Sequence, residues 1–388
     1  MTMTKIPAEF KGISGEIKRD ADLILDRVLK NRSIEDFPKV AKRAELSGSG
    51  AAVAYPIQGV LKYHGMPDWD FRTAFMPSVS LNNDAAKSVT TVEFDKSLNH
   101  DHAIINGKTA EGRDLERVKQ TLDMIRSLTG AKTFAKVESK NIVRASKTGK
   151  GLGTSASGSA ALALAAIHAS LGEEYSTNNR FVTVVSRFLA GSGCRSAAGG
   201  LAYWHSYPGI KHEDSFALRL DTKGELKDVS LVTVPVDSRI GLKTEQAHQD
   251  APNSPFFRDW LLKRKAQSTQ LLDALDKGDW ETIAKLAEMD TILLHGVTMS
   301  GSYGNKIIAW EPETLQMMRA ANEMRNQGIK AYYSIDTGPT PVFITHKSFE
   351  QKVAGHLKQM GFQDVITGKI AGPSRVITAE EAQRLLKG

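Results

Sequence analysis

A stretch rich in glycine and hydroxyl residues, KTGKGLGTSASGSAALA over residues 147–163, carries residue types that bind anions. Glycine lets the backbone approach a ligand closely, and the hydroxyl groups of Thr154, Ser155 and Ser157 can donate hydrogen bonds. The alanine-rich half predicts a helix whose positive N-terminal end points back at the loop. The glycines of the stretch are Gly149, Gly151, Gly153 and Gly158. We interpret it as a phosphate-binding loop; the alternative is a small-residue turn needed only for packing.

A second candidate for anion binding is Arg195, which lies in the segment GSGCRS over residues 191–196. A guanidinium group surrounded by small residues can bind a carboxylate or a phosphate through two parallel hydrogen bonds. The segment therefore predicts a second anion-binding element.

The segment SIDTGP over residues 334–339 places Asp336 in an Asp-Thr-Gly triplet, which also occurs in aspartic proteases. Those enzymes need two such carboxylates in one site, and this long α/β chain has a single triplet followed by Pro339. We therefore reject a protease. A turn favoured by aspartate, glycine and proline remains the alternative to a functional aspartate.

Metal binding has little support in the sequence. His100 and His102 flank Asp101, but no third ligand is suggested nearby, so we expect a solvent-exposed turn and no metal. The single cysteine, Cys194, excludes an intrachain disulfide and a cysteine-based zinc site, and it fits a reducing compartment.

The charge balance favours a small anionic partner. The 388 residues carry a formal net charge of +7, but the only compact basic run is residues 263–265, without interleaved aromatic residues. We therefore expect a phosphorylated metabolite as partner and no nucleic acid. The N-terminus has no basic-then-apolar signal pattern and the apolar runs are short, so we expect a cytosolic protein without membrane contact.

The periodicity of apolar residues predicts a mixed α/β (α+β) chain. Residues 15–32 predict an amphipathic helix that packs on the outside of the main domain. From residue 50 onward, β-branched and aromatic runs separated by turn residues predict a sheet. The later part alternates strands and helices, which predicts a second domain with a split β-α-β plan. Its elements are expected at residues 229–236, 255–277, 280–294, 312–327, 331–335 and 341–346.

Four blocks in a fixed order resemble the GHMP kinase superfamily and, within it, the decarboxylases of the mevalonate pathway. They are PIQGVLKYHG, GLGTSASGSAALA, SGCRSAAGGLAYW and YYSIDTGPTPVF, and the resemblance spans roughly residues 51–376. It implies an N-terminal domain like ribosomal protein S5 domain 2 and a ferredoxin-like C-terminal domain, with a cleft between them. We expect an N-terminal extension over residues 1–48, the two domains over residues 49–225 and 226–388, and a homodimer.

The resemblance also implies roles for individual residues. Asp336 matches the family's catalytic aspartate, Lys62 the lysine beside it, and Arg195 the arginine that holds the substrate carboxylate. The residues implied to contact substrate, or to face its phosphate from the loop, are Tyr63, Ser192, Lys243, Gly151, Gly153, Thr154 and Ser155.

The chain departs from the family pattern at the substrate's phosphate end. Diphosphomevalonate decarboxylases have K-Y-W-G-K where this chain has Met66 for the second lysine and His64 for tryptophan, and Ala190 replaces a serine. The loss of a cation and a hydroxyl predicts a 5-monophosphate rather than a diphosphate, because each charge-assisted contact contributes roughly 1.5 to 3 kcal/mol.

The loop departs as well, with Lys147 and Lys150 replacing proline and alanine, and Ile57 stands in place of an asparagine. These features resemble the archaeal branch that decarboxylates mevalonate 3,5-bisphosphate to isopentenyl phosphate without ATP, so we expect no cofactor. The alternatives are a decarboxylase that uses ATP and Mg²⁺ on diphosphomevalonate or phosphomevalonate, a mevalonate-type 3-kinase, and a non-catalytic ligand sensor.

Overall fold

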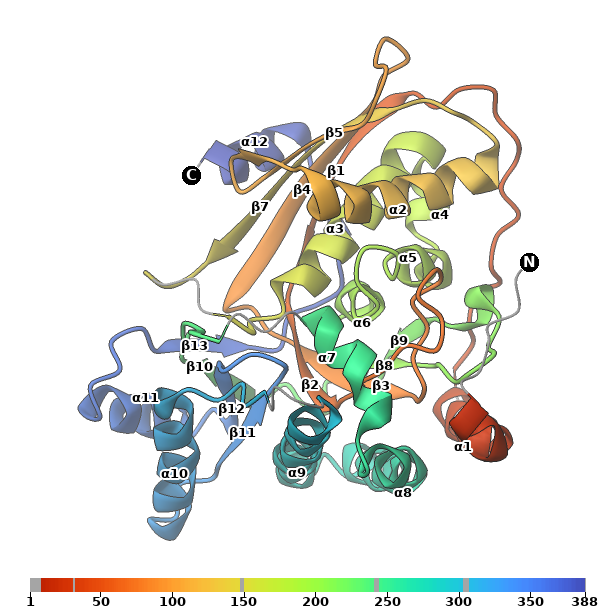
Figure 1. Ribbon diagram of the computed structural model, residues 1–388. Coiled ribbons are helices and arrows are strands. Elements are labelled where there is room, and N and C mark those ends of the chain that lie inside the picture. Colours follow the sequence, from red (N-terminus) through yellow and green to blue (C-terminus); the bar gives the residue numbers. More distant parts are fainter. Residues whose placement is uncertain (1–7, 31, 147–149, 241–243, 303–306, 388) are drawn as a thin grey trace.

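The computed structural model describes residues 8–30, 32–146, 150–240, 244–302 and 307–387 (Figure 1). Its strands form three sheets, and nearly all neighbouring strands are antiparallel. The first sheet has the order β14 (Arg375–Val376), β1 (Gly48–Ala54), β4 (Ala86–Phe94), β7 (Ala135–Val143), β5 (His102–Ile105) and β6 (Lys108–Thr109). The second sheet has the order β2 (Ile57–Leu61), β3 (Ser78–Asn82), β8 (Leu201–Trp204) and β9 (Ala217–Arg219).

The third sheet has the order β11 (Ala331–Ile335), β12 (Pro341–His346), β10 (Val229–Thr233) and β13 (Ile366–Lys369). Helix α10 (Pro312–Asn326) precedes β11, and α11 (Glu350–Gln359) connects β12 to β13. The first strand of this unit in the chain therefore lies between the third and the fourth, which is the split β-α-β plan. The predicted ferredoxin-like domain is confirmed.

Helix α3 (Thr154–Leu171) is the central helix of the N-terminal part, and 14 of its residues are buried. Alanine side chains let it lie directly on β1, where an added Cβ on Gly50 would be 2.3 Å from the Ala165 carbonyl oxygen. The predicted alanine-rich helix is thus confirmed, and its composition follows from close packing on all sides. The helices around it are α2 (Gly112–Thr129), α4 (Glu173–Ser176), α5 (Asn179–Val185) and α6 (Gly193–Ala198).

The N-terminal extension is helix α1 (Lys11–Leu29), which lies against α8 (Phe257–Asp276). Its apolar stripe, including Ile24 and Val28, is buried, and Arg27 pairs with Asp273. The prediction that this helix packs on the outside is confirmed, with a start four residues earlier. The remaining helices are α7 (Thr244–Asp250), α9 (Trp280–Gly301) and α12 (Ala379–Lys387).

The last strand and helix return to the first sheet. Strand β14 pairs with β1, and α12 contacts β1 and β4 on the face opposite α3 (Figure 1). Ala382 of α12 is buried beside Val53 and Val89. The predicted domain boundary at residue 226 stays a prediction. Strand β14 lies after this boundary in the sequence but belongs to the first sheet.

The triplet around Asp101 differs from the expected solvent-exposed turn. Asp101 is buried, accepts hydrogen bonds from Arg126 at 3.0 and 2.5 Å, and accepts a third from the Ala135 amide at 2.8 Å. It is a structural carboxylate, because the pair ties α2 to the start of β7. Within the described ranges, no group of three His, Cys, Asp or Glu side chains is arranged to hold a metal, and no helix there could cross a membrane.

Candidate active site

All but one of the predicted site residues line one cavity of about 270 Å³ between the N-terminal and C-terminal parts. They come from the end of β2, the loop before α3, the start of α6 and the turn between β11 and β12. The residues brought together are Lys62, Tyr63, Gly151, Gly153, Thr154, Ser155, Ser192, Arg195 and Asp336. The exception is Lys243, which lies outside the described residues.

Lys62 and Asp336 form an ion pair in which Lys62 is buried and Asp336 is partly exposed, with the ammonium nitrogen Nζ 2.9 Å from Oδ1. Nζ also donates to the Gly59 carbonyl at 2.6 Å and to Ser334 Oγ at 2.5 Å, so its three hydrogens all have acceptors. Burial lowers the pKa of Lys62 below its ordinary value, and the Asp336 charge opposes this shift. The pair is therefore held in one geometry.

Gly59 on β2 makes the close approach of this pair possible. Its amide donates to both carboxylate oxygens of Asp336, at 3.1 and 3.3 Å. A Cβ at this position would lie 2.8 Å from Asp336 Oδ1 and 2.8 Å from Lys62 Cγ. Only glycine leaves room for the pair here.

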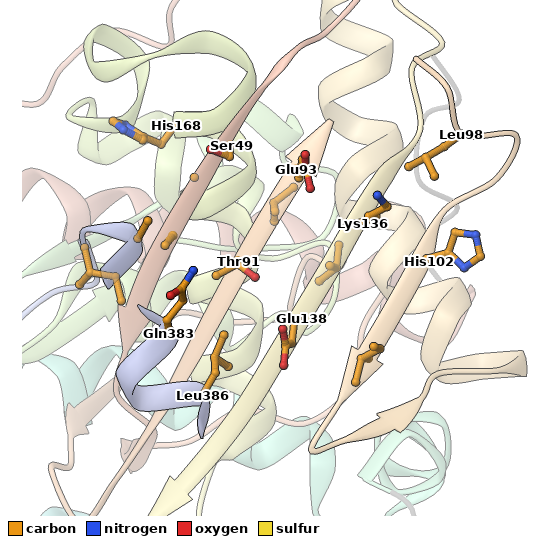
Figure 2. A pocket seen from close by; sticks show the side chains of 17 residues that line it. Ser49, Thr91, Glu93, Leu98, His102, Lys136, Glu138, His168, Gln383 and Leu386 are labelled. Atoms are coloured by element: carbon orange, nitrogen blue, oxygen red, sulfur yellow. The ribbon is translucent and has the colours of Figure 1, made fainter. Parts of the chain in front are cut away.

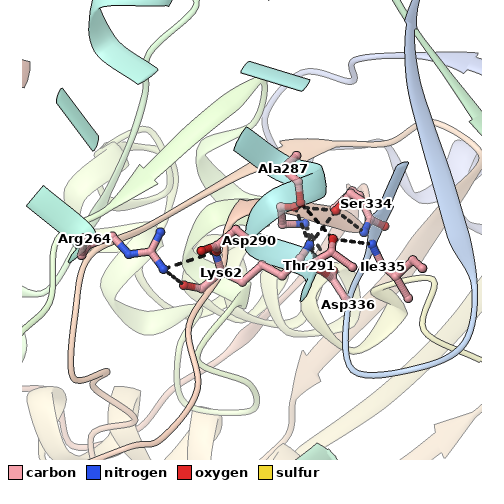
Figure 3. Close-up of polar contacts among 10 residues, drawn as sticks. Lys62, Arg264, Ala287, Asp290, Thr291, Ser334, Ile335 and Asp336 are labelled. Carbon is pink, nitrogen blue, oxygen red and sulfur yellow. Dashed lines mark hydrogen bonds and ion pairs between the residues drawn. The ribbon is translucent and has the colours of Figure 1, made fainter. Parts of the chain in front are cut away.

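The backbone of Lys62 is fixed by a second buried pair that sequence analysis missed (Figure 3). Asp290 of α9 is fully buried and accepts from the Lys62 amide at 2.5 Å. Arg264 of α8 donates to the Lys62 carbonyl at 2.6 Å and lies 3.3 Å from Asp290. Trp260 donates its Nε1 hydrogen to the same carboxylate at 2.8 Å. The two helices thus hold Lys62 on both sides of its Cα.

The Asp336 side of the pair is positioned by β11 and α9. Ser334 Oγ accepts from Gln58 Nε2 at 2.9 Å and donates to the Gly59 carbonyl at 2.6 Å, which joins β11 to β2. Thr291 Oγ1 accepts from the Ile335 amide at 3.1 Å, next to Asp336. Thr291 lies in no local motif, and Gln58 lies in the PIQGVLKYHG block but was assigned no role there.

Arg195 contrasts with this saturated pair. It is 2% exposed, its guanidinium carbon lies 5.2 Å from the centre of the Tyr63 ring, and its Nε and Nη1 have no hydrogen-bond partner among the described residues. A buried cation without an acceptor is unfavourable unless a ligand supplies one. The arrangement fits an anion that enters the cavity.

Aromatic and imidazole rings pack together at the wall of the cavity, where Tyr63 and His248 line it and His64 contacts His248. Tyr63 stacks on His248 with ring centres 5.1 Å apart, and His64 Nδ1 lies 3.2 Å from His248 Nδ1. Burial raises the pKa of Tyr63 to about 12 and lowers the pKa of His64 to about 4. The wall is therefore neutral at pH 7, and the role of His248 was not predicted.

The loop before α3 meets the Asp336 turn backbone to backbone. Gly151 has φ +95° and Gly153 has φ +73°, and a Cβ on Gly153 would lie 2.5 Å from the Ile57 carbonyl oxygen. Gly338 is so close to Gly151 that its Cβ would lie 2.8 Å from the Gly151 Cα. Gly151 and Gly153, two of the four glycines of the predicted loop, are thus required by close packing. Thr154 and Ser155 face the cavity at the start of α3.

A second cavity of about 370 Å³ adjoins the first and shares Tyr63 and Ser192 with it. Met66 and Ala190, the two departures from the family pattern, both line it. Three arginines line it as well, at positions 72, 113 and 117. The predicted loss of a cation at the phosphate end stays a prediction, and these arginines add positive charge to the same cavity.

A larger cavity, of about 730 Å³, lies on the outer face of the first sheet beside α12 (Figure 2). Thr91 and Glu93 project from β4 and Lys136 and Glu138 from β7, while Gln383 and Leu386 of α12 border it. None of the predicted site residues lines it. Size alone does not identify the active site, and the converging polar groups of the smaller cavity do.

Comparison with known proteins agrees with this geometry. Residues 54–217 match the diphosphomevalonate decarboxylase-like N-terminal domain. The phosphomevalonate decarboxylase of Haloferax volcanii is 32% identical over 332 residues, 85% of this chain and 98% of that protein. The mevalonate 3,5-bisphosphate decarboxylase of Thermoplasma volcanium is 30% identical over 74% of both chains.

Solved structures give the same result. The mevalonate diphosphate decarboxylase of Enterococcus faecalis superposes with a TM-score of 0.77 at 27% identity, over 86% of this chain and 99% of that one. The Staphylococcus aureus enzyme has a TM-score of 0.78 at 25% identity, over 85% and 98% of the two chains. The predicted homodimer and cytosolic location stay predictions, but the predicted fold and resemblance are confirmed: the chain belongs to the mevalonate decarboxylase family with the GHMP kinase fold.

Proposed function

We propose that this chain decarboxylates a mevalonate with a single phosphate on C5, releasing isopentenyl phosphate, inorganic phosphate and CO₂. The observation that carries the proposal is the position of Arg195. Its buried guanidinium lacks acceptors among the described residues and lines the same cavity as the Lys62–Asp336 pair. A carboxylate bound to Arg195 would lie in the cavity that contains both charges of the pair.

In this mechanism a phosphate on C3 leaves with the electrons of the C3–O bond. The electrons of the C1–C2 bond then form the C2=C3 double bond, and C1 departs as CO₂. Asp336 stabilises positive charge that develops at C3, and Lys62 with the loop before α3 attracts the departing phosphate. Arg195 orients the carboxylate so that its bond to C2 aligns with the forming double bond.

The monophosphate on C5 is supported by two observations. Met66 and Ala190 replace a lysine and a serine of the diphosphate-binding pattern, and both line the second cavity. The relatives from Haloferax volcanii and Thermoplasma volcanium, at 32% and 30% identity, bear names that indicate a 5-monophosphate substrate. Five relatives named diphosphomevalonate decarboxylase are 24 to 26% identical, and the Enterococcus faecalis enzyme is 27% identical.

For the source of the 3-phosphate, we propose ATP as the first candidate. The name of the Haloferax volcanii relative indicates a phosphomevalonate substrate, which has a hydroxyl group on C3 and would need a phosphoryl donor. Gly151, Gly153 and the start of α3 suit nucleotide phosphates and their Mg²⁺, because close backbone and hydroxyl groups face the cavity. Asp336 would first accept the proton of the C3 hydroxyl group, whose oxygen would then take the terminal phosphoryl group of ATP with release of ADP.

The second candidate takes mevalonate 3,5-bisphosphate directly and needs no nucleotide. The loop departures favour it, since Lys150 replaces an alanine and Ile57 an asparagine of ATP-using relatives. In this case the loop would contact the substrate's own 3-phosphate.

One experiment separates the candidates and tests the common proposal. Purified protein is incubated with mevalonate 5-phosphate, 5-diphosphate or 3,5-bisphosphate, each with and without ATP and Mg²⁺, and CO₂ release is measured. ATP-dependent release from the 5-phosphate supports the first candidate. Release from the bisphosphate without ATP, with none from the 5-phosphate, supports the second. Release from the 5-diphosphate alone would contradict the proposed monophosphate.

A further inference from the structure

The second cavity is lined by more basic than acidic side chains. Arg72, Arg113, Arg117 and Lys150 face it together with the carboxylates of Asp114 and Glu245. Arg113 pairs with Glu245, and Arg117 donates through Nε to the Leu189 carbonyl at 3.1 Å. The excess of positive charge beside the catalytic cavity fits an anionic group of the substrate.

Arg72 is the most buried of these basic groups and has an unusual backbone. It is 7% exposed and its φ is +49°, a conformation that residues with a Cβ seldom adopt. Its Nη2 donates to Gln120 Oε1 at 2.8 Å, whereas its Nε has no partner among the described residues. A strained backbone that presents a buried and incompletely bonded arginine is more typical of a functional position than of a packing one.

The turn that carries Arg72 is held firmly on both sides. The Phe71 amide donates to Asp68 Oδ1 at 2.9 Å, and the Thr73 amide donates to the Asp68 carbonyl at 3.2 Å. The fully buried Arg187 donates to the Phe71 carbonyl at 3.0 Å. The guanidinium of Arg72 is therefore presented by a preorganised turn.

The arginines also repel one another. Burial, together with the charges of Arg72 and Arg113, lowers the pKa of Arg117 to about 10. A bound dianion would relieve this repulsion and supply acceptors to the free guanidinium hydrogens.

The position of the cavity identifies which end of the substrate it receives. Tyr63 and Ser192 line both cavities, so a chain that starts at Asp336 and Arg195 can continue past them. Met66 and Ala190, which hold the family's positions for the phosphate end of the substrate, line this cavity, so the phosphate on C5 is expected here. We propose that Arg72 is its principal ligand, with Arg113 and Arg117 as supporting cations. This assignment rests on the proposed function, and it places Arg72 in the role of the lysine that Met66 replaces.

The test compares Arg72→Asn, Arg72→Lys and the control Arg19→Asn, which changes an exposed arginine of α1. Asparagine tolerates positive φ, so the first variant removes the charge with little new backbone strain. Isothermal titration measures the affinity for isopentenyl phosphate, isopentenyl diphosphate and the uncharged alcohol isopentenol. Far-UV circular dichroism checks the fold of each variant.

We expect Arg72→Asn to weaken binding of isopentenyl phosphate about tenfold or more, with partial recovery in Arg72→Lys and no change in Arg19→Asn. Binding of isopentenol should not change. In turnover assays KM should rise about tenfold while kcat changes less than threefold, because a remote anchor binds substrate and transition state alike.

Unchanged affinity for isopentenyl phosphate in Arg72→Asn would overturn the assignment, and so would a loss confined to the diphosphate. If Arg72→Asn does not fold, the same measurements on Arg72→Lys and Arg117→Gln decide, and unchanged affinity in both overturns the assignment. Because the binding measurements need no turnover, an inactive wild-type protein that binds isopentenyl phosphate through Arg72 would refute the proposed reaction alone.

Discussion

The Lys62–Asp336 pair and the arginines of the site differ in how many of their polar atoms have hydrogen-bond partners. Lys62 has an acceptor for each ammonium hydrogen and backbone partners on both sides, whereas Arg195 and Arg72 keep guanidinium nitrogens without partners among the described residues. Under the proposed function, the groups assigned to the charge at C3 are preorganised by the protein. The groups assigned to the substrate's anions gain their remaining partners only when substrate binds.

The largest expected effect comes from breaking the ion pair between Lys62 and Asp336. Asp336→Asn keeps the shape but removes the charge that faces Lys62, so we expect kcat to fall by about 10³-fold or more. Single-turnover CO₂ release measures this, and thermal unfolding checks the fold. Activity within tenfold of wild type in a folded variant would contradict the assigned role.

Arg195→Met tests the arginine whose Nε and Nη1 have no hydrogen-bond partner among the described residues. It removes the carboxylate ligand, so kcat/KM should fall roughly 10²- to 10³-fold. It also removes a buried cation without full partners, so the ligand-free protein should gain about 1 kcal/mol in free energy of unfolding. Urea unfolding measures the gain.

Lys62→Met is the matched variant in the Lys62–Asp336 pair and should lower the free energy of unfolding, because it removes the cation that pairs with Asp336. The comparison fails if both variants shift stability in the same direction.

Gly59→Ala tests whether Lys62 and Asp336 need the close approach of the Gly59 backbone. The added methyl would lie 2.8 Å from both Asp336 Oδ1 and Lys62 Cγ, so the pair must move and kcat should fall about 10²-fold. Gly355→Ala on α11, where nothing lies within 4 Å of the new Cβ, is the control and should retain wild-type kcat. Equal activity of the two variants would argue against a precise geometry.

Asp290→Asn tests the support beneath Lys62. It keeps the size of the side chain but removes the charge opposite the buried Arg264, so kcat should fall about tenfold and the free energy of unfolding by roughly 3 kcal/mol. A pH–rate profile with a displaced limb would show that Asp290 acts through Lys62. An unchanged profile with a lower unfolding free energy would leave Asp290 a purely structural role.

The smallest effect concerns His64, which contacts His248 beside the site. Burial lowers the pKa of His64 from its ordinary value of 6.5 to about 4. The unfolded chain therefore takes up the proton first, and stability present above pH 6.5 declines as the pH falls toward 4. For this one histidine the loss by pH 5 is about 2 kcal/mol.

Urea unfolding at pH 7 and pH 5 measures the loss, and His64→Gln should show a shallower decline. A variant that declines as steeply as wild type would place the acid sensitivity elsewhere.

The sequence predicted the site well where its residues lie in local blocks, and poorly where packing decides. The loop residues and Arg195 stand in short motifs whose glycines mark a close backbone approach. Arg264 belongs to the compact basic run over residues 263–265, which was considered only as a possible nucleic-acid contact, yet it is 2% exposed. Its spacing of four from Trp260 on α8 was the one available sign that it faces inward.

Arg72 and Asp290 gave no comparable sign. The backbone of Arg72 depends on a turn held by the distant Arg187, and the partners of Asp290 come from α8 and the end of β2. Such long-range partners are set by the packing of elements, which apolar periodicity alone does not specify. The fold could be predicted more fully than the site, because the order of strands and helices was enough to predict the split β-α-β domain.

The pairing of β14 with β1 has a consequence for synthesis on the ribosome. Ala52 pairs with Val376, 324 positions later. While the intervening chain is being translated, that edge of β1 exposes its backbone hydrogen-bonding groups, which is a hazard for aggregation. The first sheet can be completed only after residue 376 has left the exit tunnel, so a nascent chain that stalls before this point would be a natural client for a chaperone that covers strand edges.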